Sequence, residues 1–276
     1  MPIDNSFMIK RIETFDSILL AVCAATHHPF IECDENTYDD QAFLFTDEEM
    51  FRGFAERWAR DKIILQGARI PKAQIKKTLQ SLYWLGVNSV VVQDEGAPVT
   101  IELEKLAEKP DLEALENDRL PRANPLLQLT GLYFMQQLTR KVERTKEEKK
   151  QLRDLEEEMA HNMFRSRFIL AFDLSGNKGK FVPGRPGQKI GVPLIKRKDG
   201  SLYMPVYSDM GEFQRYNRKT PGKKMQIMAV PYEKLMSMLP PNAKGFVFNP
   251  GGFHLSLSRD QMAEIKRRYK QEEEEE

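Results

Sequence analysis

The alternation of apolar and polar residues is clearest near the end of the chain, between residues 245 and 261. Apolar residues lead into Asn249-Pro250-Gly251-Gly252, and a run of alternating apolar and polar residues follows. Proline presets the φ angle that begins a turn and glycine accepts positive φ, so this segment predicts a β-hairpin. Ser258 and Gln261 have the spacing of a capping box, and a final helix is therefore expected after the hairpin.

The first half of the chain carries similar patterns. Ile18, Leu19, Val22 and Cys23 have helical spacing, which predicts an opening core helix over residues 13–28. The capping-box sequence Thr46-Asp47-Glu48-Glu49 predicts the start of a second helix. The other expected elements are strands at 30–33, 41–45 and 62–66, a helix at 71–85, and a hairpin that joins 88–93 to 97–102.

The middle of the chain changes character twice. Residues 104–125 are charged and contain Pro110, Pro121 and Pro125, a composition typical of a linker. An apolar half-helix over 126–138 and a densely charged helical stretch over 140–158 follow. Beyond them we expect a strand at 168–172 and a hairpin of 190–195 with 201–207, because Lys198-Asp199-Gly200 is a strong turn signal.

The two halves of the chain resemble each other. Val92 matches Phe248, Gly96 matches Gly252 and Ile101 matches Leu257, each 156 residues apart (248 − 92). Pro71 matches Pro231, and the segment from Phe43 to Asp47 matches the segment from Met204 to Asp209. A repeat of this length indicates duplicated domains rather than a solenoid, whose period is about 20–50 residues. We expect two α+β domains (1–108 and 151–271), each a mixed β-sheet with packed helices, a charged helical linker (109–150) and an acidic tail (272–276).

This order of elements resembles the SseB family, the enhanced-serine-sensitivity proteins of bacteria. The second copy fits better because Asn249-Pro250-Gly251-Gly252 is intact, whereas the first has Gln93-Asp94-Glu95-Gly96. The resemblance covers roughly two-thirds of the chain and implies an α+β fold, here as two tandem SseB N-terminal-type domains, in a bacterial protein. It brings no established catalytic residues.

Composition restricts the class of protein. The chain has 276 residues, 41% of them hydrophobic and 30% charged, enough to form two cores. The net charge of +1 favours no particular partner. Two cysteines give no disulfide framework, and no signal peptide or membrane-length apolar run is evident, so a cytoplasmic location without membrane contact is expected.

The charge is unevenly distributed. Between Gly176 and Lys224 twelve lysines and arginines stand against three acidic residues, an excess of nine (12 − 3), and aromatic residues lie among them. Cationic surfaces with aromatic side chains hold single-stranded nucleic acid through phosphate contacts and stacking. Nucleic-acid binding by residues 176–224 is therefore the alternative hypothesis, beside a solvated basic face that complements the acidic first domain or a protein partner.

Residues suited to metal binding or catalysis are few. Cys23, His27, His28 and Cys33 contain zinc-type ligands, but their spacing matches no standard motif, and a core cysteine with histidines at a helix end is the preferred interpretation. No serine or cysteine lies in a nucleophile motif. We therefore predict no catalytic residue, no metal and no cofactor, and an enzyme of an unknown small substrate is the third hypothesis.

The favoured function is that of a non-catalytic, regulatory or binding protein that contacts another protein. Loops on a rigid sheet are suitable binding sites. The expected interaction surface consists of Asn249, Pro250, Gly251, Gly252, Lys196, Arg197, Lys198 and Tyr207.

Overall fold

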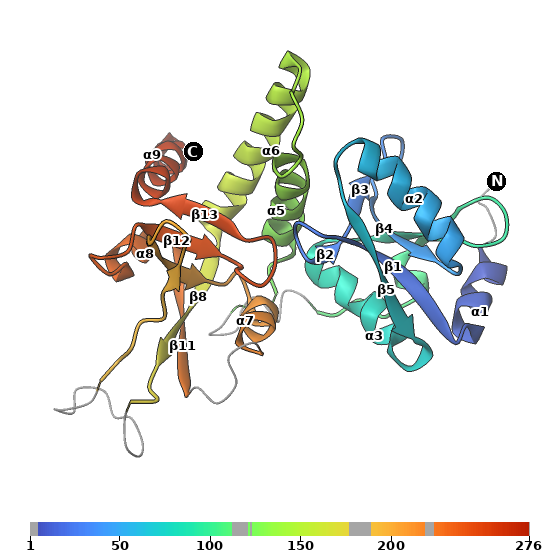
Figure 1. The fold of residues 1–276 in the computed structure, drawn as a ribbon, viewed down its shortest axis with the longest axis horizontal. Helices are drawn as coiled ribbons and strands as arrows, with labels where there is room; N and C mark the ends of the chain where they lie inside the picture. Colours follow the sequence, from blue (N-terminus) through green and yellow to red (C-terminus); the bar gives the residue numbers. More distant parts are fainter. Residues whose placement is uncertain (1–4, 112–120, 122, 177–188, 219–223, 276) are drawn as a thin grey trace. The chain divides into compact units, whose positions relative to one another are not determined.

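The structure is a computed structural model that describes residues 5–111, 121, 123–176, 189–218 and 224–275 (Figure 1). The chain divides into two compact units. Residues 1–112 with 128–157 form unit 1, and residues 113–127 with 158–276 form unit 2. Both contain helices packed on mixed sheets, so the predicted α+β class is confirmed.

Unit 1 is organised on a seven-stranded sheet in the order β2-β1-β4-β6-β7, with β3 paired to β4 and β5 paired to β1. β4 and β6 are parallel and the other pairs are antiparallel. The elements are α1 (Ser6–Thr14), β1 (Ser17–Cys23), β2 (His28–Pro29), β3 (Ile31–Cys33), β4 (Asp40–Phe45), α2 (Glu48–Arg60), β5 (Leu65–Pro71), α3 (Lys72–Leu82), η1 (Tyr83–Leu85), β6 (Ser89–Gln93), β7 (Val99–Glu102) and η2 (Leu103–Lys105).

Aromatic side chains join α2 to one face of this sheet. Phe54, on the apolar stripe of the helix, lies 4.8 Å from Phe43 of β4 and 5.1 Å from Phe45 between ring centroids. Phe30 packs 4.7 Å from Trp58. Full burial of one such ring contributes about 1.5–3 kcal/mol, so this cluster accounts for much of the attachment of α2.

The apolar helix α5 (Pro125–Leu138) lies in the region expected to be a linker, yet its residues from Gln128 onward belong to unit 1. The Gln136 side chain forms two hydrogen bonds with the backbone of Ile31, accepting at 3.1 Å and donating at 2.8 Å. Tyr133 donates to Asp40 at 2.6 Å. These bonds fix the helix to the β3–β4 side of the sheet.

Unit 2 contains a four-stranded sheet, β13-β12-β10-β9, and a two-stranded β11-β8 ladder. A bridge between Ile169 and Tyr207 joins the ladder to the sheet. The elements are α6 (Lys146–Arg165, which begins in unit 1), β8 (Arg167–Asp173), β9 (Ile195–Lys196), β10 (Leu202–Val206), α7 (Met210–Asn217), β11 (Met225–Pro231), α8 (Tyr232–Met238), β12 (Gly245–Phe248), β13 (Leu255–Ser258) and α9 (Arg259–Glu275).

The hydrogen-bonded registers of the two units correspond. The first strand of each unit, β1 or β8, pairs antiparallel with a strand that ends in proline, β5 or β11. Each unit also has one parallel pair, β4 with β6 in unit 1 and β10 with β12 in unit 2. Residues matched in the sequence therefore have equivalent places in their sheets. The corresponding pairs are Ser17↔Pro71 and Arg167↔Pro231, Leu19↔Phe45 and Ile169↔Tyr207, Gln41↔Ser89 and Tyr203↔Gly245, and Ser89↔Glu102 and Gly245↔Ser258.

The predicted opening helix at 13–28 is wrong. Residues 17–23 form β1, and the first helix lies earlier, at Ser6–Thr14. β1 is buried on both faces from Ile18 to Ala21, so its sequence lacks the alternation that identifies a half-exposed strand. A short continuous apolar run does not distinguish a buried strand from a buried helix.

Other local predictions differ by a few residues. Asp47, rather than Thr46, caps α2, because its carboxylate accepts from the backbone of Glu49 and Met50. The Ser258–Gln261 capping box is confirmed by reciprocal bonds of 2.9 and 3.3 Å. The strand expected at 62–66 lies at 65–71, and the predicted acidic tail continues α9 as far as Glu275, since glutamate is a good helix former.

The Asp40–Tyr133 contact gives a test by pH. Burial is the main cause that raises the pKa of Asp40, and the charge of Asp39 adds to it, although the bond from Tyr133 opposes the shift. A raised folded-state pKa means that the folded protein holds the proton more tightly than the unfolded chain does. Ionised Asp40 therefore destabilises the fold as pH rises above about 3.9, the ordinary value, through the raised pKa.

We expect Asp40→Asn to keep the bond from Tyr133 and to gain stability relative to the wild type as pH rises from 3 to 7 (~4 units). Urea unfolding at several pH values measures this difference, with Asp154→Asn on the exposed side of α6 as the control. A constant difference between Asp40→Asn and the wild type would contradict the raised pKa.

Candidate functional site

The Asn249–Gly252 turn has an internal structural role. Asn249 is completely buried, with φ 47°. Its side chain accepts from the backbone N–H of Ser208 and donates to the Ser208 hydroxyl, both at 2.8 Å. Gly251 and Gly252 are also buried, and a Cβ on Gly251 would lie 3.2 Å from the backbone nitrogen of Tyr216. The turn thus fastens β12 to the start of α7 and presents little surface to a partner; only Pro250 is half-buried.

Tyr207 and the basic hairpin differ in exposure. Tyr207 is 2% exposed and packs against Phe213 at 5.4 Å, so the structure contradicts its place on an interaction surface. The residue is directed into the core because it continues the buried strand β10. Lys196, Arg197 and Lys198 are exposed, and the hairpin predicted through Gly200 is present with φ 83° at that glycine. Of the residues predicted to form the interaction surface, these three cations are the exposed ones.

The aromatic residues of the basic segment are largely occupied. The Arg197 guanidinium lies 4.4 Å from the centre of the Tyr203 ring and its side chain also donates to Ser256. Tyr216 packs on Tyr207 at 5.9 Å. Residues 177–188 and 219–223, which include Phe181, lie outside the described residues. The described part of this segment therefore offers little open ring surface for base stacking.

The residues suggested as metal-like lie on three strands and one turn. Cys23 is buried in β1 and Cys33 is exposed at the end of β3. Both are free thiols, and the part of the chain that the structure describes contains no cluster of three metal-type ligands. His27 has φ 56° and lies in the tight turn that joins β1 to β2. The turn therefore explains where this histidine lies.

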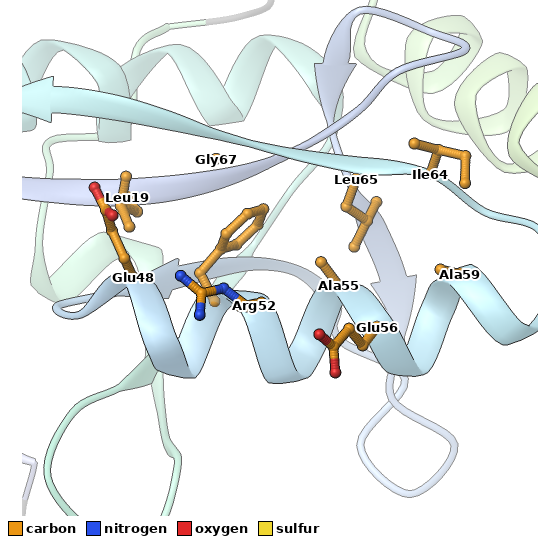
Figure 2. Close-up of a pocket in the computed structure, with 10 residues that line it drawn as sticks. Leu19, Glu48, Arg52, Ala55, Glu56, Ala59, Ile64, Leu65 and Gly67 are labelled. Atoms are coloured by element: carbon orange, nitrogen blue, oxygen red, sulfur yellow. The ribbon is translucent and has the colours of Figure 1, made fainter.

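A groove in unit 1 is a stronger candidate. It has a volume of about 410 Å³ and lies between α2 and β5 (Figure 2). Ala55 and Ala59 are turned toward the strand, and Leu19 and Leu65 lie between the helix and the sheet. The charged side chains of the lining, Glu48, Arg52 and Glu56, come from α2, so the groove has an apolar floor and a charged rim.

β5 forms one wall of the groove and has an open edge. Within the described residues it pairs with β1 alone. Ala24 donates to the carbonyl of Ile64 at 2.9 Å, and Lys72 donates to that of Asp16 at 2.8 Å. Backbone groups of an antiparallel strand alternate in direction, so every second residue from Ile64 faces β1. The N–H and C=O groups of Leu65, Gly67 and Arg69 therefore point away from the sheet.

Gly67 lets an aromatic ring of α2 approach the strand. A Cβ at Gly67 would lie 3.1 Å from the Phe51 ring, so the ring packs directly against the strand. Gly67 pairs with Ala21, and the equivalent residue of unit 2, paired with Ala171, is Ile227. Ile227 packs on the cluster that contains Phe213. The space beside this strand position is thus taken by the strand's own Ile227 side chain in unit 2 and by the Phe51 ring of α2 in unit 1.

The residues of this groove were missed by the sequence patterns. The strand was expected to end at residue 66, before Gly67 and Arg69. A glycine within a strand often marks close approach of another group, and this signal was available. Glu48 of the lining forms an ion pair with Arg69, whose guanidinium also donates to Ser17 at 3.1 Å.

Comparison with known proteins supports a family for unit 2. Residues 144–264 match the model of the SseB protein N-terminal domain, as the resemblance implied. A search of curated proteins returned no match. Two solved structures are similar to the chain. Anabaena Tic22 (protein transport) has 11% identity and a TM-score of 0.21, and the match covers 94% of this chain and 96% of that one. Tic22 from Plasmodium falciparum has 11% identity and a TM-score of 0.20, and the match covers 95% of this chain and 97% of that one. TM-scores this low carry no argument about function. Among the described residues, no helix is long and apolar enough to span a membrane.

Asn249→Ala tests the structural role of the turn. Loss of both bonds to Ser208 removes the acceptor of a buried N–H group, so we expect a loss of roughly 1–3 kcal/mol in unfolding free energy. His254→Ala is the matched control, because His254 also has positive φ (53°) but is exposed. Equal losses in the two variants, measured by denaturant unfolding, would show that backbone strain alone is responsible.

A proline pair tests the direction of the β5 backbone. Arg69→Pro removes an outward N–H group and an exposed ion pair worth at most about 1 kcal/mol. Ala68→Pro removes a hydrogen bond to β1, and we expect it to destabilise unit 1 by at least about 1 kcal/mol more. Denaturant unfolding measures both variants, and a larger loss for Arg69→Pro would reverse the assignment of the open edge.

Proposed function

We propose that this chain is a non-catalytic, protein-binding module that takes up an extended segment of a partner along the outer edge of β5. The single observation that carries the proposal is the row of outward backbone groups at Leu65, Gly67 and Arg69 beside an apolar groove. An exposed strand edge is a template for another strand, and main-chain hydrogen bonds then supply affinity while side-chain pockets supply specificity.

The groove restricts the side chains of the segment. A strand added to β5 directs alternate side chains to the α2 face. On that face the lining is formed by Leu19, Phe51, Ala55, Ala59 and Leu65. Because two of these are alanines, the space beside them suits residues of the size of alanine, valine or leucine at every second position. A regulatory protein of this kind needs no reaction at the groove.

The proposal includes the origin and location of the protein. Both units are SseB N-terminal-type domains derived from a duplication; the corresponding strand registers of the two units support this, as does the family match of residues 144–264. We place the protein in a bacterial cytoplasm, a location with which two free cysteines are compatible.

Ala59→Leu tests the function. Leucine is nearly as good a helix former as alanine, so the change fills the groove without breaking α2. Against a displayed library of random heptapeptides, we expect the wild type to enrich sequences with alternating small apolar residues. The affinity of Ala59→Leu for the selected peptides should fall about tenfold or more, equivalent to about 1.4 kcal/mol.

Gly53→Ala is the matched control, because a Cβ at this position of α2 meets nothing within 4 Å. It should retain binding and gain up to about 1 kcal/mol in unfolding free energy from helix propensity. Isothermal calorimetry with the selected peptides measures the affinities. Undiminished binding by both Ala59→Leu and Arg69→Pro would refute the groove as the site. If the library yields no enriched peptide and the protein instead binds nucleic acid through Lys196, Arg197 and Lys198, the alternative hypothesis is favoured.

A further inference from the structure

A second hollow lies next to the groove in unit 1. It has a volume of about 420 Å³, and Ile64 lines both. Its floor is apolar and includes Cys23, Ala24, Ala25 and Ile63, from the end of β1 and the segment before β5. Ile64 itself is 56% exposed, although isoleucine is among the residues most often buried. The groove along β5 thus continues beyond the start of the strand.

The charge of this hollow differs from that of the groove. Lys62 and Lys141 belong to its lining, together with the neutral polar residues Gln136 and Thr139, and no acidic residue does. The adjacent Arg140 donates to the carbonyl of Asp61 at 2.8 Å, so it offsets part of the negative end of the α2 dipole. The hollow is therefore suited to an anion attached to an apolar group.

Lys62 has an unusual backbone conformation. It follows the C-cap residue of α2 with φ 62°, where glycine is the favoured residue, and its N–H donates to the Ala59 carbonyl at 3.1 Å. A non-glycine residue in the left-handed region is strained, because its Cβ lies close to the following carbonyl oxygen. Lysine at this position therefore adds a positive charge to the hollow at some expense of stability, as strained residues at binding sites do.

The direction of the bound strand follows from the position of these charges. β5 runs from Leu65 away from the hollow. An antiparallel strand on its open edge would end at the hollow with its C-terminus, whereas a parallel strand would begin there with a positively charged amine. The two lysines attract a carboxylate and repel an amine. The antiparallel direction is therefore favoured.

We propose that the segment bound by β5 is the C-terminus of a partner protein, antiparallel to β5, with its terminal carboxylate in the hollow lined by Lys62 and Lys141. This inference rests on the proposed function and adds the identity of the end that is recognised. The carboxylate receives the lysine charges, the last apolar side chain covers Ile64 and the floor, and the preceding residues form the strand.

The test presents the same heptapeptide library in three forms: with a free C-terminal carboxylate, with a C-terminal amide, and embedded between flanking residues. We expect enrichment in the first form alone, and the best peptide as free acid should bind at least about tenfold more tightly than its amide. The difference should shrink in high salt, since exposed charges are screened.

The variants identify the lysines. Lys62→Gly combined with Lys141→Gln should bind the acid and the amide equally, while Lys77→Gln on α3 keeps the preference of the wild type. Lys62→Gly should fold normally in denaturant unfolding, because glycine adopts positive φ without strain. Equal binding of acid, amide and embedded peptides by the wild type would overturn this inference and leave the proposed function standing. Absence of binding in all three forms would overturn the proposed function as well.

Discussion

The antiparallel pairing of β1 with β5 is the constraint on which the rest of unit 1 depends. Seven residue pairs, from Ser17↔Pro71 to Cys23↔Leu65, fix which residues of β5 direct their backbone groups to β1 and which direct them outward. The same register turns Leu65 and Gly67 toward α2. A shift by one residue would exchange both assignments, because side chains alternate with a period of two. The groove, its open edge and its apolar floor are thus consequences of one pairing.

An open edge is ordinarily a hazard, and unit 1 limits it with charge. Edge strands avoid aggregation when charged residues and proline interrupt them. On β5, Arg69 pairs with Glu48 at one end and Pro71 terminates the strand, whereas Lys62 precedes it at the other. The unprotected length is therefore limited to the few residues beside the groove. That length suits one short strand and disfavours extended sheet growth.

The elements predicted successfully are those determined by neighbouring residues. Asn249-Pro250-Gly251-Gly252 requires a turn by its own backbone preferences, and Ser258 with Gln261 forms a cap within one helical turn. The failures depend on distant contacts. Residues 17–23 are a strand because other strands surround them, and α5 packs on unit 1 through Gln136 and Ile31, which are 105 residues apart. No local pattern reports either fact.

The prediction of an interaction surface at the Asn249–Gly252 turn also rested on a local signal, and this turn is largely buried. The turn at Asn249 is conspicuous in the sequence because it needs special residues, and these requirements are structural: a buried amide bonded to Ser208. In unit 1 the equivalent junction is fastened differently, with Thr46 bonded to Asp94 at 2.8 Å and Arg11 paired with Asp94 at 2.7 Å. Either solution stabilises the junction between strand and helix, so the Asn-Pro-Gly-Gly motif has a structural explanation.

The groove, in contrast, is made by side chains that are small or absent. Ala55 and Ala59 leave space between α2 and β5, and Gly67 lets the Phe51 ring pack against the strand where unit 2 has Ile227. Small residues occur throughout a sequence and seldom carry a distinctive signal, and their effect appears only when the fold brings several of them to one place. Two units with corresponding registers therefore differ in how this one strand position is packed, and the groove lies in the unit whose strand has a glycine there.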